Sequence, residues 1–302
     1  MARRPSRRPA RRRPARAALA VVAVLGVLAA AVVGIVVGLD RLTPDEPATA
    51  SCTATVDGTS WSMTPDQAQH AALFAGMATQ RGLPARAVTI AIATALQESR
   101  LENIDYGDRD SIGLFQQRPS QGWGTVEQIM DPVYATGQFY DRLVEVEGYQ
   151  DMTITQAAQA VQRSAFPEAY AQHEGAARTW ASALTGYSPH AITCTLPEPD
   201  GEAFSYGSPQ SVAQRAARDL GDLRVEELHG GDDTPDYAVL HAEDLGADVE
   251  RQAWAVAAWA VATASQTGVE SVEVAGRTWD RSDGSWSERD SSLDPGLVRV
   301  EL

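Results

Sequence analysis

The chain has 302 residues, a formal net charge of −15 and 44 % hydrophobic residues, so it can bury a sizeable core and is not disordered throughout. All 25 basic residues are arginine, and the absence of lysine excludes Schiff-base chemistry and the lysine of a phosphate-binding P-loop. Eight of these arginines lie in residues 1–16, which leaves the remainder strongly acidic and a poor candidate for binding nucleic acid.

An uncharged, mostly aliphatic run, residues 17–39, follows this arginine-rich arm. As a helix rising about 1.5 Å per residue it would span roughly 34 Å, enough for a bilayer core of about 30 Å. The arginines favour the cytoplasmic side, so we expect a single-pass signal anchor in the cell membrane with the C-terminal bulk extracytoplasmic. A cleaved signal peptide is the alternative, although its apolar region normally has only about 7–15 residues.

Cys52 and Cys194 are the only cysteines. They lie beside two segments, 40–51 and 195–207, whose prolines, glycines and polar residues are typical of linkers. In an oxidising compartment a disulfide between them would tie together the ends of a unit spanning 52–194, whereas two unrelated buried thiols are the alternative. Two cysteines and scattered histidines match no metal-ligand spacing, and we expect no metal or other cofactor.

Helix-start signals, mostly a Thr or Asp before Pro, divide the unit 52–194 into predicted helices. They are expected at about 65–80, 85–101, 132–147, 154–163 and 167–186. The second helix is apolar nearly all round, which predicts a buried central position. Residues 60–187 show no convincing alternation of the kind typical of strands, so the unit is predicted to be mainly α-helical.

Glu98 is the only acid in the predicted helix 85–101 and lies near its C-terminal end. Partial burial and the negative end of the helix dipole should both raise its pKa, as a general acid working near neutral pH requires. The following loop carries Asp105, Tyr106 and Asp108, and it can surround a sugar-sized pocket with polar groups and an aromatic face. A structural Glu98 paired with an arginine, beside a merely solvated loop, is the alternative.

Two short motifs carry a resemblance to a known family. Glu98 and Ser99 end an apolar helix, and after a polar loop come Gly113, Leu114, Phe115 and Gln116. This order and spacing resembles the soluble lytic transglycosylases and their goose-type lysozyme relatives, with Phe115 in place of the family's usual methionine. The loop also looks like that of an actinobacterial subgroup of exported proteins. The resemblance covers roughly residues 64–187.

The resemblance implies a lysozyme-like fold and an enzyme, a peptidoglycan lytic transglycosylase or related glycosidase. Its substrate would be glycan strands, cut at the β-1,4 bond between N-acetylmuramic acid and N-acetylglucosamine. By its position in the motif, Glu98 is the catalytic acid and base: it would protonate the glycosidic oxygen and then take a proton from the muramoyl 6-hydroxyl. One carboxyl suffices because the substrate's N-acetyl group can stabilise the positive centre, whereas ordinary glycosidases use two. The other motif residues would orient Glu98 or the sugar.

The family's third motif, Ala-Tyr-Asn-Ala-Gly, has no clean copy. Its place is taken by residues 160–164, where Gln162 supplies the amide, and Tyr170 from the next predicted helix is a candidate for the missing ring. Asp105 and Asp108 occupy the region where goose-type enzymes carry carboxylates that assist a water molecule. Hydrolysis with inversion therefore stays open beside the lytic route.

Residues 208–302 are predicted to form a small α+β domain with βαβ-like alternation. Helices are expected at about 209–220 and 246–267, and strands at about 224–228, 236–241, 269–274, 277–280 and 297–302. This region has no phosphate loop, nucleophile elbow or zinc-protease motif. We interpret it as a structural or interaction module, with another cell-envelope protein as one candidate partner.

The predicted whole is a mainly α, lysozyme-like domain after one N-terminal transmembrane helix, followed by a small α+β domain. The leading hypothesis is a membrane-anchored enzyme that cleaves peptidoglycan outside the cytoplasm. A non-catalytic protein that binds or assembles the cell wall on the same fold is the alternative, and the missing third motif favours it. Trp123 is predicted with equal weight as a sugar-stacking platform or as a wedge in the core.

Overall fold

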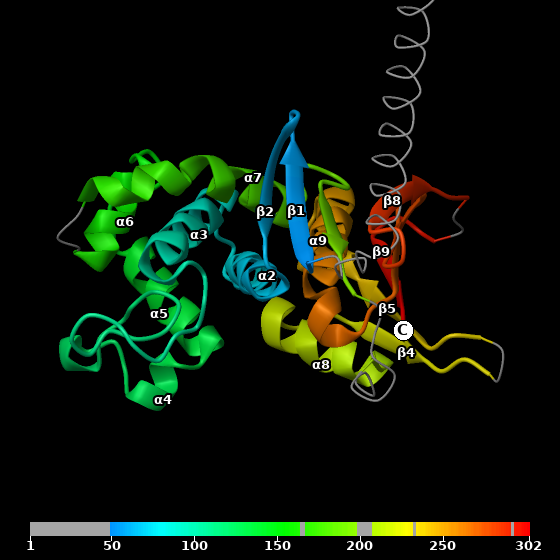
Figure 1. The fold of residues 1–302 in the computed structure, drawn as a ribbon. Helices are drawn as coiled ribbons and strands as arrows, with labels where there is room; N and C mark the ends of the chain where they lie inside the picture. The colour runs from blue at the N-terminus through cyan, green and yellow to red at the C-terminus, as the bar shows by residue number, and fades with distance from the viewer. Residues whose placement is uncertain (1–48, 164–166, 198–206, 232–233, 291–292) are drawn as a thin grey trace, which may run out of the picture. The chain divides into compact units, whose positions relative to one another are not determined.

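The computed structural model describes residues 49–302 apart from 164–166, 198–206, 232–233 and 291–292 (Figure 1). The arginine-rich arm 1–16 and the predicted membrane segment 17–39 lie outside the described residues. Within the part of the chain that is described, no helix is both long and apolar enough to cross a bilayer. The single-pass anchor and the membrane localisation derived from it therefore lack support, and both predictions are corrected.

Side-chain caps begin several helices of the N-terminal unit. Thr64, Thr125 and Thr153 each accept a hydrogen bond from the backbone N–H three residues on, and the glutamine at that position bonds back to close a capping box. The predicted helix 167–186 is divided into a 3₁₀ segment, η2, and a shorter α-helix, α7. The helical elements are α2 (Pro65–Gln80), α3 (Ala85–Ser99), η1 (Pro119–Gln121), α4 (Val126–Ile129), α5 (Pro132–Val144), α6 (Ile154–Gln162), η2 (Pro167–His173) and α7 (Glu174–Leu184).

A three-stranded antiparallel sheet joins the two ends of this unit. Strand β1 (Ser51–Val56) lies between β2 (Thr59–Met63) and β3 (Ile192–Thr195). The turn from β1 to β2 is Asp57-Gly58, with φ of 50° and 74°, as a two-residue hairpin turn matched to the strand twist requires. The expectation that residues 60–187 contain no strand is therefore wrong at β2, although an Asp-Gly pair is itself a hairpin signal.

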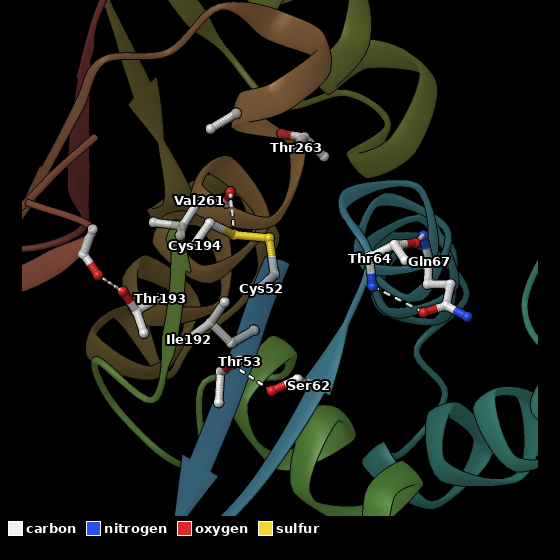
Figure 2. Close-up of a disulfide and its surroundings, with 12 residues drawn as sticks. Cys52, Thr53, Ser62, Thr64, Gln67, Ile192, Thr193, Cys194, Val261 and Thr263 are labelled. Atoms are coloured by element: carbon white, nitrogen blue, oxygen red, sulfur yellow. Dashed lines mark hydrogen bonds between the residues drawn. A yellow bond between two sulfur atoms is a disulfide. The ribbon is translucent and has the colours of Figure 1, made fainter. Parts of the chain in front are cut away.

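Cys52 and Cys194 are directly opposite each other in the pairing of β1 with β3 and form a disulfide (Figure 2). The predicted bond is thus confirmed. Because it joins residues 142 apart in sequence, the chain-entropy model gives it up to roughly 5 kcal/mol of stabilisation. Both cysteines are buried, and the Cys194 sulfur lies 3.4 Å from the carbonyl oxygen of Val261 in α9 (Val249–Thr267).

The C-terminal unit is built on one six-stranded sheet of order β4-β5-β9-β6-β7-β8, in which every neighbouring pair is antiparallel. Strands β5 and β6 flank α9 in the chain and both pair with β9, so the last strand is inserted into a βαβ-type crossover. Trp254 of α9 stands edge-on to Trp286 of β8, with ring centroids 5.5 Å apart. The elements are α8 (Pro209–Leu220), β4 (Val225–Leu228), β5 (Tyr237–His241), η3 (Ala242–Leu245), α9, β6 (Ser271–Val274), β7 (Arg277–Asp280), β8 (Ser285–Glu288) and β9 (Leu297–Glu301).

The two units pack directly on each other. Gly76 of α2 lies so close to the carbonyl oxygen of Asp219 in α8 that a Cβ there would approach within 2.3 Å, and Gln80 donates to the same oxygen at 2.8 Å. Residues Thr49–Leu302 accordingly form one compact unit. With about 47 % helix and 18 % strand in two sheets, the described chain is mixed, which corrects the predicted fold class.

Candidate active site

Glu98 lies in the last turn of α3, a helix whose residues are buried nearly all round. Its carboxyl is partly buried, and this desolvation raises the pKa of Glu98 above its ordinary value. The phenol of Tyr170 donates to Glu98 Oε1 at 2.6 Å, and this bond, with one from Gln162, lowers the pKa and opposes burial only in part. The site therefore contains one carboxyl that is easier to protonate than a solvated glutamate.

Two residues in left-handed conformation end α3 immediately after the site. Arg100 and Leu101 have φ of 59° and 64°, although neither is glycine, and such a conformation costs about 1–2 kcal/mol per residue. Helix α2 holds both carbonyls: Gln67 donates to that of Arg100 at 2.7 Å, and the His70 ring contacts that of Leu101 at 2.9 Å. Sequence reasoning missed these anchors, because no local pattern links α2 to the end of α3.

The second motif supports Glu98 through its backbone. Ser99 Oγ donates to the carbonyl of Leu114 at 2.7 Å, which fixes the loop against the end of α3. The side chains of Leu114 and Phe115 are fully buried, and the Phe115 ring stacks between Phe74 and Phe139 with centroids 5.0 and 4.4 Å away. These two side chains therefore belong to the core and contact no substrate.

Glycine is required where this motif begins. Gly113 has φ of 76°, and a Cβ there would approach the carbonyl oxygen of Ile129 within 2.9 Å. Its own N–H donates to the carbonyl of Ile104 at 2.7 Å. The motif glycine thus lets the loop turn tightly against α4 and return to the end of α3.

The substitutes proposed for the third motif meet at Glu98. Gln162 ends α6 and donates from Nε2 to the carbonyl of Phe115 at 2.7 Å, while Tyr170 arrives from η2. The Gln162 Oε1 atom is buried without a hydrogen-bond partner in the described part of the chain. The structure therefore brings together an acid from α3 with an amide from α6 and a phenol from η2, more than 60 residues further along the chain.

The acidic loop is exposed. Asp105 and Asp108 are both exposed, and the Asp108 carboxylate forms an ion pair with Arg109, at 3.9 Å, that is open to solvent. Among the described residues no ion pair involves Glu98, so the alternative in which it pairs with an arginine gains no support. Gln116 faces the loop, because its Nε2 donates to the carbonyl of Tyr106 at 3.2 Å.

Trp123 packs in the hydrophobic core. Its side chain is only 5 % exposed, and the guanidinium of Arg142 covers its ring at 3.5 Å from the centroid. Arg142 also donates to the carbonyl of Gly122 at 3.1 Å, which holds it in place. With one face covered and the ring buried, Trp123 offers no stacking surface, and the interpretation as a wedge is the one that the structure supports.

The cavities described in the structure are lined by residues other than Glu98. One of about 350 Å³ lies between the start of α3, at Pro84, and the start of α9, at Arg251. The others lie against strands of the two sheets. The groove expected at Glu98 is therefore not among them. In the described residues, no group of three His, Cys, Asp or Glu side chains could hold a metal ion.

Comparison with known proteins found no matching family model and no matching curated protein. The resemblance to lytic transglycosylases accordingly rests on the motifs around Glu98 alone. The prediction of a membrane protein has no support in the described residues, and that of a lytic transglycosylase has none beyond those motifs, whereas the disulfide is present.

Proposed function

We propose that the protein cleaves the β-1,4 glycosidic bond of peptidoglycan with Glu98 as its acid and base. The observation that carries this is the single carboxyl in the last turn of a buried helix. Burial raises its pKa, and its hydrogen-bond partners are neutral. A carboxylic acid with a raised pKa is what protonation of a leaving oxygen needs. The disulfide is consistent with work in an oxidising compartment.

The proton balance assigns a role to each oxygen. Tyr170 donates to Oε1, so the transferable proton resides on Oε2 and passes to the glycosidic oxygen as its bond to the sugar breaks. The resulting carboxylate is stabilised by the Tyr170 and Gln162 hydrogen bonds. It then removes a proton from either the muramoyl 6-hydroxyl or a water molecule, which restores the acid. Tyr170 and Gln162 are positioning residues in this scheme.

The decisive experiment incubates the full-length protein with purified sacculi and analyses the released fragments by mass spectrometry. The wild type should release muropeptides, and Glu98→Gln should release at least about 100-fold less, since positioned acid–base catalysis contributes that much. Glu102→Gln, an exposed acid just beyond the same helix, is the matched control and should behave as the wild type. Anhydro ends would identify the lytic route and reducing ends hydrolysis. Release by Glu98→Gln equal to that of the wild type, or none by the wild type, refutes the proposal.

A non-catalytic protein that binds the cell wall is the second candidate. It is favoured by the missing third motif and by the placement of Asp105 and Asp108 in exposed positions. In that case the protein sediments with sacculi, no bond is cut, and Glu98→Gln binds like the wild type. The same two assays therefore separate the candidates.

A further inference from the structure

The loop between α3 and η1 presents one aromatic ring to solvent. Tyr106 is 69 % exposed, whereas Phe115 later in the same loop is fully buried. An exposed aromatic residue alone needs no explanation, because much of any protein surface is apolar. The position of Tyr106 is informative because the backbone that carries it is held rigidly.

Tight packing fixes the backbone on both sides of this ring. Gln116 donates from Nε2 to the Tyr106 carbonyl at 3.2 Å. The next residue, Gly107, has no room for a side chain, because a Cβ would come within 1.9 Å of Gln116 Oε1 and 2.5 Å of the Ser111 carbonyl oxygen. The Ser111 N–H in turn donates to the carbonyl of Asp108 at 3.0 Å. The backbone that carries the ring is therefore already ordered. Binding of a ligand would cost little conformational entropy in this loop.

The segment that fixes Tyr106 is also the segment that supports Glu98. Gln162 hydrogen-bonds Glu98 and donates to the carbonyl of Phe115 at 2.7 Å, and Gln116, the next residue, holds Tyr106. A short chain of hydrogen bonds thus couples the acid to the base of the exposed ring. A polymeric substrate extends past the bond being cut on both sides, so a ring on the loop that is linked to the supports of Glu98 can contact another sugar of the same strand.

We propose that Tyr106 is a stacking platform for a sugar ring of the glycan strand, next to the unit on which Glu98 acts. The aromatic face packs against the C–H face of the sugar, and the exposed carboxylates of Asp105 and Asp108 on either side accept hydrogen bonds from its hydroxyl and amide groups. This platform rests on the proposed function for its substrate class. It binds the strand without taking part in bond cleavage.

The test measures binding of the full-length protein to purified sacculi by co-sedimentation, and cleavage by release of soluble muropeptides. Tyr106→Ala should weaken binding about tenfold, a typical effect of losing one aromatic contact, and should raise KM with little change in kcat. Tyr106→Phe and Tyr106→Trp should retain binding, because they keep the aromatic face. Tyr187→Ala is the matched control, since Tyr187 is similarly exposed at 63 % and follows α7.

The outcomes distinguish failure of the platform from failure of the proposed catalysis. Unchanged binding by Tyr106→Ala, equal weakening by Tyr187→Ala, or no binding by the wild type overturns the platform. Binding that depends on Tyr106 without release of muropeptides by the wild type supports the platform as a glycan-binding site and refutes catalysis by Glu98. Near-ultraviolet circular dichroism of each variant shows whether its fold is intact.

Discussion

Two carboxylates, Glu98 and Asp219, are taken out of water in this protein and given opposite surroundings. Glu98 is partly buried and, among the described residues, receives hydrogen bonds from the neutral Tyr170 and Gln162. Asp219 is fully buried and receives charged partners, Arg215 Nε at 2.6 Å and Arg218 Nε at 2.7 Å.

The indole N–H of Trp259 also donates to Asp219, at 3.0 Å, so both of its oxygens are satisfied. A buried carboxyl with neutral partners is free to exchange its proton, whereas one with two guanidinium partners is held as an ion pair. The comparison shows that the choice of partners, more than burial itself, decides whether an acid is suited to chemistry or to architecture.

The largest effect is expected from Asp219→Ala. It leaves Arg215, whose side chain is only 11 % exposed, without its counter-ion, and loss of one partner of a buried pair costs about 3–5 kcal/mol. Urea unfolding followed by circular dichroism measures the change. Asp222→Ala, an exposed acid just after the same helix, is the control and should lie within about 0.5 kcal/mol of the wild type. If Asp219→Ala lowers the free energy of unfolding by less than about 1 kcal/mol, the ion pair contributes little to stability.

Glu98→Gln should have a smaller effect on stability, and one of opposite sign. Because the pKa of Glu98 is raised in the folded state from 4.5, the folded protein binds the proton more tightly than the unfolded chain. The free energy of unfolding of the wild type therefore decreases as pH rises from 4.5 to the pKa of Glu98 in the folded state. Below pH 4.5 this destabilisation is absent. At pH 7 the variant should melt higher than the wild type, and at pH 4 the difference should shrink. A variant less stable than the wild type at pH 7 would contradict this prediction.

The smallest effect is expected from Tyr170→Phe, which keeps the ring and removes the hydroxyl. Its hydrogen bond lowers the pKa of Glu98, so removing it should raise that pKa further. If Glu98 is the general acid, activity falls as pH rises through its pKa, and the alkaline limb of kcat/KM should move to higher pH. Tyr134→Phe, on α5, serves as the control and should leave the limb unchanged. A shift of the limb to lower pH, or no shift, would show that the hydrogen bond from Tyr170 does not lower the pKa of Glu98.

Much of the local structure could be predicted from particular residues. Thr64, Thr153 and the prolines after helix-start signals located several helices within a few residues. Cys52 and Cys194 were predicted as partners from their places at the edges of one unit. Strand β9 was predicted close to its observed bounds, but β1, β2, β3 and β8 were not predicted, because such short strands depend on partners far along the chain.

The candidate site was predictable in composition but not in arrangement. The pattern singled out Glu98, Gln162 and Tyr170, and the structure brings their side chains together across three elements. Phe115 shows the opposite case, since a motif residue predicted to bind the sugar or to orient it or Glu98 has its side chain stacked within the core. Spacing along one chain cannot show which face of a loop turns inward.

By itself, the sequence determined the acidic body, the absence of lysine, the buried helix that ends in Glu98, and the disulfide frame, because each follows from residue type and short-range periodicity. Only the tertiary structure decided that Tyr170 donates to Glu98, that Trp123 is covered by Arg142, and that Asp219 joins the two units. These contacts depend on which surfaces are buried against each other. That burial is set by neighbours that are distant in sequence.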